Sequence, residues 1–273
     1  MRANYHTHTP RCRHASGTPA EYVETALNNG LQILGFSDHV PYPFSNGYRS
    51  GFRMDVSETE AYTTEIMSLQ DAFKERLQIL IGYEAEYYPA EFAAMLENIL
   101  QYPCDYLILG QHCLGNEYDG PPSGGPMRRE RELQTYVDQC IAGLQTGLFS
   151  CLAHPDLPRF TGLRKSYRWQ MERLCKTAKE LEIPLELNLL GLHGGRNYPD
   201  PAFWSIAAEV GNQVIVGCDA HQPGGGEIRP EPGKRHPAGN PGGRGTRNGV
   251  PGASEGIHDE RKGAAPRDGK SGA

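Results

Sequence analysis

Long apolar runs are missing from this 273-residue chain, which contains no stretch of 18 or more consecutive apolar residues. A helix that crosses a bilayer needs about 20 such residues. The start of the chain also lacks the charged segment followed by an apolar run that is typical of a secretory signal. We therefore expect a soluble, cytoplasmic protein. The apolar share of 38% is enough for one sizeable core.

Paired cysteines are lacking too. The chain has seven cysteines, an odd number, and no two of them form a CxxC pair. This usage argues against a disulfide framework and against a structural zinc knuckle. We expect reduced and mostly buried thiols at Cys12, Cys104, Cys113, Cys140, Cys151, Cys175 and Cys218.

An excess of positive charge is absent, since the formal net charge is −6. An acidic chain disfavours a general nucleic-acid surface, because the phosphate backbone attracts clustered Lys and Arg. We expect no nucleic-acid partner and no membrane partner.

The end of the chain lacks the residues that build a core. Residues 222–273 contain 14 Gly and 7 Pro, with no Leu and no aromatic residue. Such a segment buries too little apolar surface to offset its conformational entropy, so we expect it to be disordered. Two origins stay open: a natural flexible extension, or an out-of-frame end, which the Gly/Pro/Arg/Ala bias favours. The expected domain boundary is therefore a barrel over 1–221 and a tail over 222–273.

What is present before residue 221 is a repeated alternation of short apolar runs with helical patterns. The runs are apolar on both faces, which indicates a parallel sheet covered by helices. Seven successive units favour an α/β, TIM-like barrel over a doubly wound sheet, which stays as the alternative. The expected strands lie in residues 2–6, 31–39, 77–87, 105–112, 148–156, 183–191 and 213–221. The expected helices lie near 19–29, 57–76, 89–101, 129–144, 167–182 and 201–210.

Two helix starts carry capping signals. Thr18 precedes a proline at the first helical position, Glu21 completes a capping box, and Gly30 ends the helix. Ser57 is expected to cap the next helix.

Each expected strand ends in a polar residue, most of which can ligate metal. In a parallel barrel these carboxyl ends meet at one mouth, where such barrels hold their active sites. A lone histidine at a strand end is more often a hydrogen-bonded polar residue than a ligand, but here seven imidazoles and two carboxylates gather. Neutral imidazoles and carboxylates suit Zn, Fe or Mn, and nine ligands exceed what one tetrahedral ion takes. We expect two or three divalent metal ions, held by His6, His8, His14, His39, Glu84, His112, His154, Asp219 and His221.

Seven successive motifs in this order resemble those of the PHP (polymerase and histidinol phosphatase) superfamily of metallohydrolases, and within it the histidinol-phosphatase branch. The resemblance covers residues 1–221. The motifs are YHTHTPRCRH, GFSDH, GYEAEY, LGQHCLGNEYDG, CLAHPDL, LELNLLG and GCDAH.

The resemblance implies a distorted (β/α)7 barrel with a trinuclear metal site. By position, it implies a first ion on His6, His8, Glu84 and Asp219, a second on Glu84, His112 and His154, and a third on His14, His39 and His221. Family members often have Asp at or just before position 14. Arg13 cannot ligate, so that role is expected of His14.

The implied reaction is metal-dependent hydrolysis of L-histidinol phosphate to L-histidinol and phosphate, in histidine biosynthesis. The residues expected to carry catalysis are Glu84, Asp219 and His221. Arg159 and Arg196 follow strand ends and resemble the family's phosphate-binding arginines, whose guanidinium groups can clamp phosphoryl oxygens.

The proton donor is less readable. Asp156 is one candidate, and an equally good hypothesis makes it the hydrogen-bond partner of a ligand histidine. Asp38 is expected to play the same supporting role.

Two other functions stay open. One is a phosphoesterase acting on another small phosphate monoester or a nucleotide. The other is an inactive metal-binding or truncated barrel, because Gly/Pro-rich sequence stands where family members continue into a helix that closes the barrel. That absence would leave apolar surface near the first and last strands exposed.

Overall fold

The fold is taken from a computed structural model of the 273-residue chain, and it describes residues 1–226. The tail predicted over residues 222–273 falls outside this part of the chain, apart from its first five residues. The described residues belong to one compact unit. None of its helices is long and apolar enough to cross a membrane.

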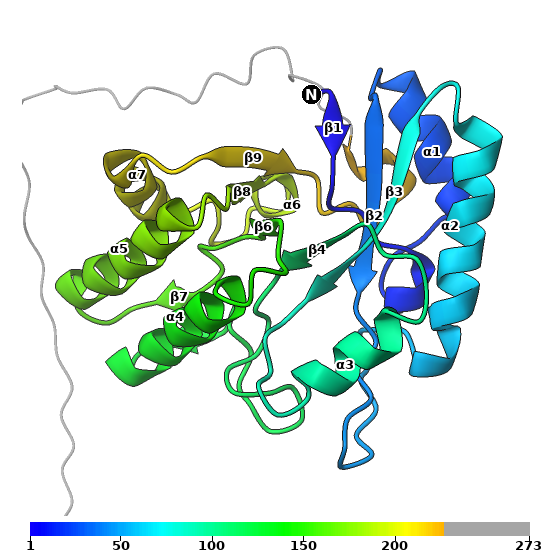
Figure 1. The fold of residues 1–273 in the computed structure, drawn as a ribbon. Helices are drawn as coiled ribbons and strands as arrows, with labels where there is room; N and C mark the ends of the chain where they lie inside the picture. The colour runs from blue at the N-terminus through cyan, green and yellow to red at the C-terminus, as the bar shows by residue number, and fades with distance from the viewer. Residues whose placement is uncertain (227–273) are drawn as a thin grey trace, which may run out of the picture. The chain divides into compact units, whose positions relative to one another are not determined.

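Seven parallel strands form the central sheet, in the order β1-β2-β3-β4-β6-β8-β9 (Figure 1). Strands that follow one another in the sequence lie side by side in the sheet, because each crossover connection places the next parallel strand beside the previous one. The strands are β1 (Ala3–Asn4), β2 (Ile33–His39), β3 (Gln78–Ala85), β4 (Tyr106–Leu109), β6 (Cys151–Leu152), β8 (Leu185–Asn188) and β9 (Val214–Gly217). All seven predicted strand positions are confirmed, although β6 is much shorter than the apolar run around it.

The sheet curls until its two ends nearly meet. A parallel bridge joins Thr7, just after β1, to Ala220, just after β9. The backbone N–H of His8 donates to Ala220 O at 2.9 Å, and the N–H of Ala220 donates to His6 O at 3.2 Å. This closure confirms the barrel and rules out the doubly wound sheet, whose edge strands stay apart.

Helices pack around the outside of the strands, as Figure 1 shows. They are α1 (Pro19–Asn28), α2 (Thr59–Phe73), α3 (Phe92–Ile99), α4 (Glu130–Leu144), α5 (Arg164–Glu180), α6 (Leu189–His193) and α7 (Pro201–Val210), with short 3-10 turns η1 (Pro10–Cys12), η2 (Val56–Glu58) and η3 (Pro223–Gly226). A small separate sheet pairs β5 (Pro126–Met127) with β7 (Arg159–Phe160). The sequence did not predict α6, the small sheet or the 3-10 turns.

One predicted cap is confirmed and one is wrong. Thr18 and Glu21 form the capping box of α1, with Pro19 in its first turn. At the second helix, Asp55 rather than Ser57 is the capping residue. Its side chain accepts the Ser57 N–H, and Glu58 completes the box at the start of η2, which leads directly into α2. Ser57 was an equally suitable cap by type, and the extra 3-10 turn moved the start two residues earlier.

The core lies between the strands and the covering helices. It includes Phe36, Tyr62, Tyr83, Tyr136 and Phe203, all buried. Burying an aromatic side chain of this size contributes about 1.5–3 kcal/mol to folding. The last strand is less well covered: Val214 and Val216 of β9 are 49% and 39% exposed. The expected exposure of apolar surface is therefore seen at the last strand, whereas Ala3 and Asn4 of the first strand are partly buried and buried.

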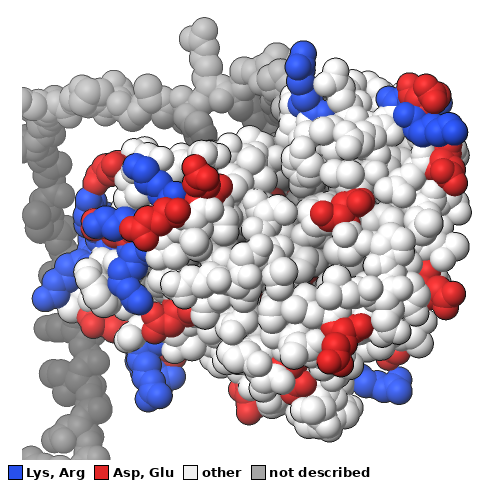
Figure 2. Space-filling model, viewed as in Figure 1, with Lys and Arg blue, Asp and Glu red and all other residues white. Residues whose placement is uncertain are grey.

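The face of the molecule in Figure 2 carries interspersed acidic and basic side chains rather than an area of one sign. Ion pairs account for part of this mixture on the outer helices. Arg173 Nη2 lies 2.8 Å from Asp138 Oδ1, and Lys176 Nζ lies 2.7 Å from Glu172 Oε1. Exposed pairs of this kind contribute little to stability.

Candidate metal centre

All nine predicted metal ligands lie at the carboxyl ends of the barrel strands. The register of β2 on β3 places His39 beside Glu84, so two ligands from different strands meet directly. The other seven come from the segments that follow β1, β4, β6 and β9, namely His6, His8, His14, His112, His154, Asp219 and His221. Eight of the nine are buried or partly buried, and His14 is exposed.

Glu84 is the centre of the cluster. Its Oε1 lies 2.8 Å from His154 Nε2 and 3.3 Å from His112 Nε2. Its Oε2 lies 3.1 Å from His39 Nδ1 and 3.4 Å from His6 Nε2. A carboxylate with imidazoles on both oxygens can bridge two ions.

Two glycines make room for buried carboxylates. A Cβ at Gly110, just after β4, would collide with the Glu84 carboxylate. A Cβ at Gly217 in β9 would collide with the carboxylate of Glu186. Neither glycine has a positive φ, so the requirement is for space and not for backbone freedom.

Asp219 gathers the first two histidines. Its Oδ1 lies 3.1 Å from His8 Nε2 and 3.5 Å from His6 Nε2, and the two Nε2 atoms are 3.2 Å apart. Asp219 and His154 both adopt positive φ angles, 49° and 30°. Asp and His tolerate this region better than most residues, and such backbone strain is concentrated at functional sites.

A third group lies closer to solvent. His14 Nε2 is 2.9 Å from His221 Nε2, and these two rings stack with centroids 4.6 Å apart. His39 completes a set whose donor atoms all lie within 4.8 Å of one another.

The donor atoms fit metal ions better than they fit one another. Asp219 Oδ1 and His39 Nδ1 are buried and have no hydrogen-bond partner within residues 1–226, although each has an imidazole or carboxylate atom 3.1 Å away. Close approach without hydrogen-bond geometry is expected when lone pairs point at a common ion. Imidazole and carboxylate donors, in several groups of three, are the set that zinc and similar divalent ions prefer.

Two glutamates behind the cluster orient its histidines. His6 Nδ1 lies 2.8 Å from Glu186 Oε1, and His112 Nδ1 lies 2.8 Å from Glu86 Oε1. A histidine that donates one ring N–H to a carboxylate presents the other nitrogen as a metal donor. Sequence reasoning missed Glu86 and Glu186. A signal existed for Glu86, which shares a strand face with Glu84 two residues earlier.

Asp38 supports the site, as the sequence predicted. Asp38 Oδ1 lies 3.4 Å from the ring nitrogen Nδ1 of His8, and it also accepts the backbone N–H of His39 at 2.7 Å. The Thr9 hydroxyl and backbone N–H also donate to Asp38. These contacts hold a fully buried carboxylate in its charged form. Burial acts to raise the pKa of Asp38, but His8 outweighs it and the pKa is lowered.

Within residues 1–226, Asp156 is not a hydrogen-bond partner of a ligand histidine, and its contacts lie at the start of α7. It is buried, and its Oδ2 accepts the backbone N–H of Asp200 at 2.6 Å and the indole N–H of Trp204 at 2.9 Å. These bonds fix the start of α7, and Asp156 has no hydrogen bond to a cluster histidine among the described residues. Burial raises its pKa to about 6.

Contacts between the buried carboxylates and nearby histidines shift the pKa values of both partners toward their charged forms. Burial acts to raise the pKa of Glu84, but His112 and His6 hold it well below its usual range. Burial likewise acts to lower the pKa of His112, while Glu84 and Glu86 raise it to about 10. Contacts with Asp219 and Asp38 raise the pKa of His8 to about 9 against the same effect of burial.

Three other histidines of the cluster, His14, His39 and His221, are held neutral. Burial, reinforced by the charge of His8, lowers the pKa of His39 to about 3 and that of His221 to about 4. Burial also lowers the pKa of His14. A neutral imidazole keeps the lone pair that binds a metal, so these three need no deprotonation step at neutral pH.

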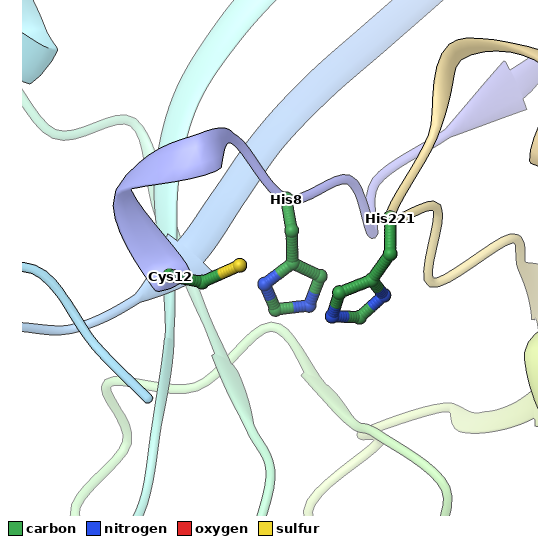
Figure 3. A group of neighbouring side chains, drawn as sticks. All are labelled: His8, Cys12 and His221. Atoms are coloured by element: carbon green, nitrogen blue, oxygen red, sulfur yellow. The ribbon is translucent and has the colours of Figure 1, made fainter. Parts of the chain in front are cut away.

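Cys12 lies beside this cluster. Figure 3 shows its sulfur pointing toward the ring of His8, which stacks on His221 with centroids 4.1 Å apart. The thiol is fully buried and accepts the Ala15 N–H at 3.2 Å, and burial raises its pKa to about 12. Cys12 is therefore a protonated packing residue here. Six of the seven cysteines are buried and none is in a disulfide, as predicted.

A cavity of about 590 Å³ opens over the cluster. Its walls include Phe52, Arg196 and Tyr198. Seven of the nine predicted ligands also line it, namely His14, His39, Glu84, His112, His154, Asp219 and His221. Arg196 Nη1 donates to the Tyr198 hydroxyl at 2.9 Å. Arg159 does not line this cavity. It is exposed on β7 and lines a neighbouring hollow that Arg196 and Tyr198 also line.

The chain is similar in sequence to a known protein family and to named proteins. The family model described as "PHP domain" matches residues 4–189. A protein of Deinococcus radiodurans named "Probable histidinol-phosphatase" is 33% identical over 226 residues, covering 80% of this chain and 86% of its own length. The "Histidinol-phosphatase" of Bacillus subtilis is 34% identical over 250 residues, covering 80% and 93%.

A solved structure shares the fold. The histidinol phosphate phosphatase of Lactococcus lactis, solved as a complex with zinc, L-histidinol and phosphate, superposes with a TM-score of 0.62 at 21% identity. The match covers 81% of this chain and 87% of the other.

Proposed function

The chain belongs to the PHP domain family, and we propose that it is a histidinol-phosphatase, a phosphoric monoester hydrolase that converts L-histidinol phosphate to L-histidinol and phosphate in histidine biosynthesis. The observation that carries the proposal is the set of imidazoles around Glu84, in a chain whose relatives at 33% and 34% identity bear that name.

Two or three divalent ions, of Zn, Fe or Mn, are proposed for the cluster. The first would be held by His6, His8, Glu84 and Asp219, the second by Glu84, His112 and His154, and the third by His14, His39 and His221. Such ions supply Lewis acidity toward the phosphoryl group and the attacking water. The zinc in the Lactococcus lactis complex supports this choice of metals.

Glu84, Asp219 and His221 are proposed as the catalytic residues of this chain. Glu84 and Asp219 stay ionised because cluster histidines lower their pKa values against the effect of burial. Both carboxylates are therefore available as negative donors to a metal ion. His221, with a pKa of about 4, stays neutral at the open side of the site.

Arg196 is proposed to bind the phosphoryl oxygens, with Arg159 at the outer edge. Arg196 lines the cavity that contains the cluster, and Tyr198 fixes its guanidinium group. A phosphate monoester dianion hydrolyses extremely slowly on its own, so charge neutralisation and orientation account for much of the acceleration. Guanidinium groups suit this role because their paired N–H groups match phosphoryl oxygens.

Phosphate release from L-histidinol phosphate tests the proposal. Protein loaded with Zn, Mn or Fe is assayed beside p-nitrophenyl phosphate, with His8→Ala as the site variant. His193→Ala is the matched control, because His193 lies exposed on α6 and outside the cluster. We expect strong preference for histidinol phosphate, loss of release in His8→Ala and none in His193→Ala.

Two results would contradict the proposal. Equal turnover of both esters would reject the substrate while keeping a metal-dependent phosphatase. No release from folded, metal-loaded protein would reject the activity and favour the truncated-barrel alternative.

A further inference from the structure

Arg53 is the largest side chain that the fold buries completely, at 1% exposure. It lies outside every expected strand and helix. Its guanidinium group donates to Glu117 Oε2 through Nε at 2.8 Å and through Nη2 at 2.5 Å. Nη2 also donates to Glu86 Oε1 at 2.9 Å, and Nη1 donates to the backbone oxygen of Val40 at 2.8 Å. A buried arginine with this many partners is held in one orientation.

The partners of Arg53 come from three separate segments at the mouth of the barrel. Val40 follows β2, Glu86 follows β3, and Glu117 lies in the loop after β4. Arg53 therefore joins the ends of neighbouring strands to a loop that forms part of the cavity wall.

One branch of the network reaches the metal cluster. Glu86 Oε1 accepts from Arg53 and also lies 2.8 Å from His112 Nδ1. Because Nδ1 faces Glu86, the nitrogen of His112 that is left for a metal ion is Nε2, which lies 3.3 Å from Glu84 Oε1. The hydrogen bonds of Arg53 within the described residues go to Val40, Glu86 and Glu117, and none of these is one of the nine predicted ligands.

The other branches reach the cavity wall. The Arg53 guanidinium carbon lies 4.5 Å from the ring centroid of Phe52, which lines the cavity. Glu117 lies in the loop from which Cys113 and Pro122 line the same cavity, and its hydrogen bonds to Arg53 anchor that loop. One cation therefore restrains both a ring and a loop that substrate would meet.

We propose that Arg53 is a positioning residue of this site: through Glu86 it sets the orientation of His112, and through Glu117 and Phe52 it holds the walls of the substrate cavity. The proposal deepens the proposed function and takes from it only that the cluster binds metal and the cavity binds a phosphate ester. A purely structural arginine would stabilise the fold and leave metal and substrate binding unchanged.

Cobalt binding separates these two roles, because the visible absorption of Co²⁺ depends on the geometry of its ligands. Co²⁺ is titrated into metal-free wild type, Arg53→Met and Arg53→Lys, and bound metal is counted independently. Replacing groups behind metal ligands costs about 10- to 100-fold in affinity. We expect Arg53→Met to weaken at least one Co²⁺ site by about tenfold or more and to change its spectrum. Arg53→Lys keeps the positive charge but lacks the paired N–H donors of the guanidinium group, so it should recover part of the lost Co²⁺ affinity.

Leu174→Ala is the control for lost stability, because Leu174 is fully buried in α5, away from the cluster. It should lower the melting temperature and leave the Co²⁺ spectrum as in wild type. Glu117→Gln tests the loop branch: it should raise KM for the phosphate ester several-fold with little change in kcat.

A Co²⁺ spectrum and stoichiometry in Arg53→Met equal to wild type would overturn the proposal, however much stability was lost. If Arg53→Met yields no folded protein, Arg53→Lys decides: wild-type Co²⁺ affinity, spectrum and KM in that variant would overturn it. Because Co²⁺ binding is measured without substrate, a wild type that fails to hydrolyse histidinol phosphate refutes the proposed function and leaves the role of Arg53 testable.

Discussion

Glu84 Oε1 and His154 Nε2 lie 2.8 Å apart although their residues are 70 positions apart in the sequence. Glu84 belongs to β3, and His154 follows β6 with a positive φ of 30°. The barrel therefore brings together two strand ends that are not neighbours in the sheet.

Glu84→Gln should abolish activity and lower the number of bound ions. The amide keeps the size of the side chain but replaces one negative oxygen by an N–H₂ group, which cannot face an imidazole donor and a cation together. We expect activity to fall by more than about 100-fold, since even groups behind metal ligands cost about 10- to 100-fold. Metal content and kcat are measured beside Glu97→Gln, an exposed glutamate of α3. Wild-type metal content in Glu84→Gln would contradict the bridging role.

Removal of metal should destabilise the protein measurably. Each site occupied at 100 times its Kd stabilises the native state by about 2.7 kcal/mol. For a barrel of this size we expect chelation to lower the melting temperature by roughly 5–10 °C per site. Differential scanning calorimetry with and without EDTA, followed by readdition of zinc, checks this. An unchanged melting temperature would argue against tight ions in the cluster.

The metal-free protein should be most stable near pH 6.5. His39 and His221 have folded pKa values of about 3 and 4, so the stability they contribute is lost as pH falls below 6.5, where the unfolded chain binds their protons. His8 and His112 have folded pKa values of about 9 and 10, so their contribution is lost as pH rises from 6.5 through those values. Bound ions compete with protons, so metal should move this optimum upward. Urea unfolding from pH 4 to 10, with and without zinc, tests the shift; an optimum that zinc leaves unmoved would count against it.

Arg196→Met should weaken substrate binding more than Arg159→Met. Arg196 lines the cavity over the cluster, whereas Arg159 lies in the adjoining hollow. A hydrogen bond to a charged group contributes about 1.5–3 kcal/mol, so we expect KM to rise roughly 10- to 100-fold for Arg196→Met. Inhibition by inorganic phosphate gives an independent measure. Arg168→Met, on the outer face of α5, is the control. A larger effect at Arg159 would reverse the assignment.

Asp156→Asn should retain activity. The amide oxygen can still accept from Asp200 N and Trp204 Nε1, so we expect unfolding free energy within about 1 kcal/mol of wild type, whereas Asp156→Ala should lose about 1–3 kcal/mol. Because the folded pKa of Asp156 is raised to about 6, its contribution to stability declines as pH rises from about 4 to 6, and the Asn variant should lack that decline. A 100-fold loss of kcat in well-folded Asp156→Asn would restore it as a proton donor.

Much of the architecture follows from local sequence. The apolar runs predicted all seven strands because residues buried on both faces leave a continuous pattern, and Thr18 with Glu21 predicted the start of α1 because a capping box is a local interaction. The ligand set could be proposed because parallel strands bring their carboxyl ends to one mouth, so position along each strand was sufficient.

Only the tertiary structure decided which groups support those ligands. Glu86, Glu186 and Arg53 act through contacts that depend on how distant segments meet, and no local pattern fixes such pairs. The bridge between Thr7 and Ala220 joins opposite ends of the barrel sequence and sets the first and last ligands beside each other. Asp156 looked like a site residue by position, yet the packing of α7 uses both of its hydrogen bonds. Residue type and strand position set what could bind, while closure of the barrel determined which atoms meet.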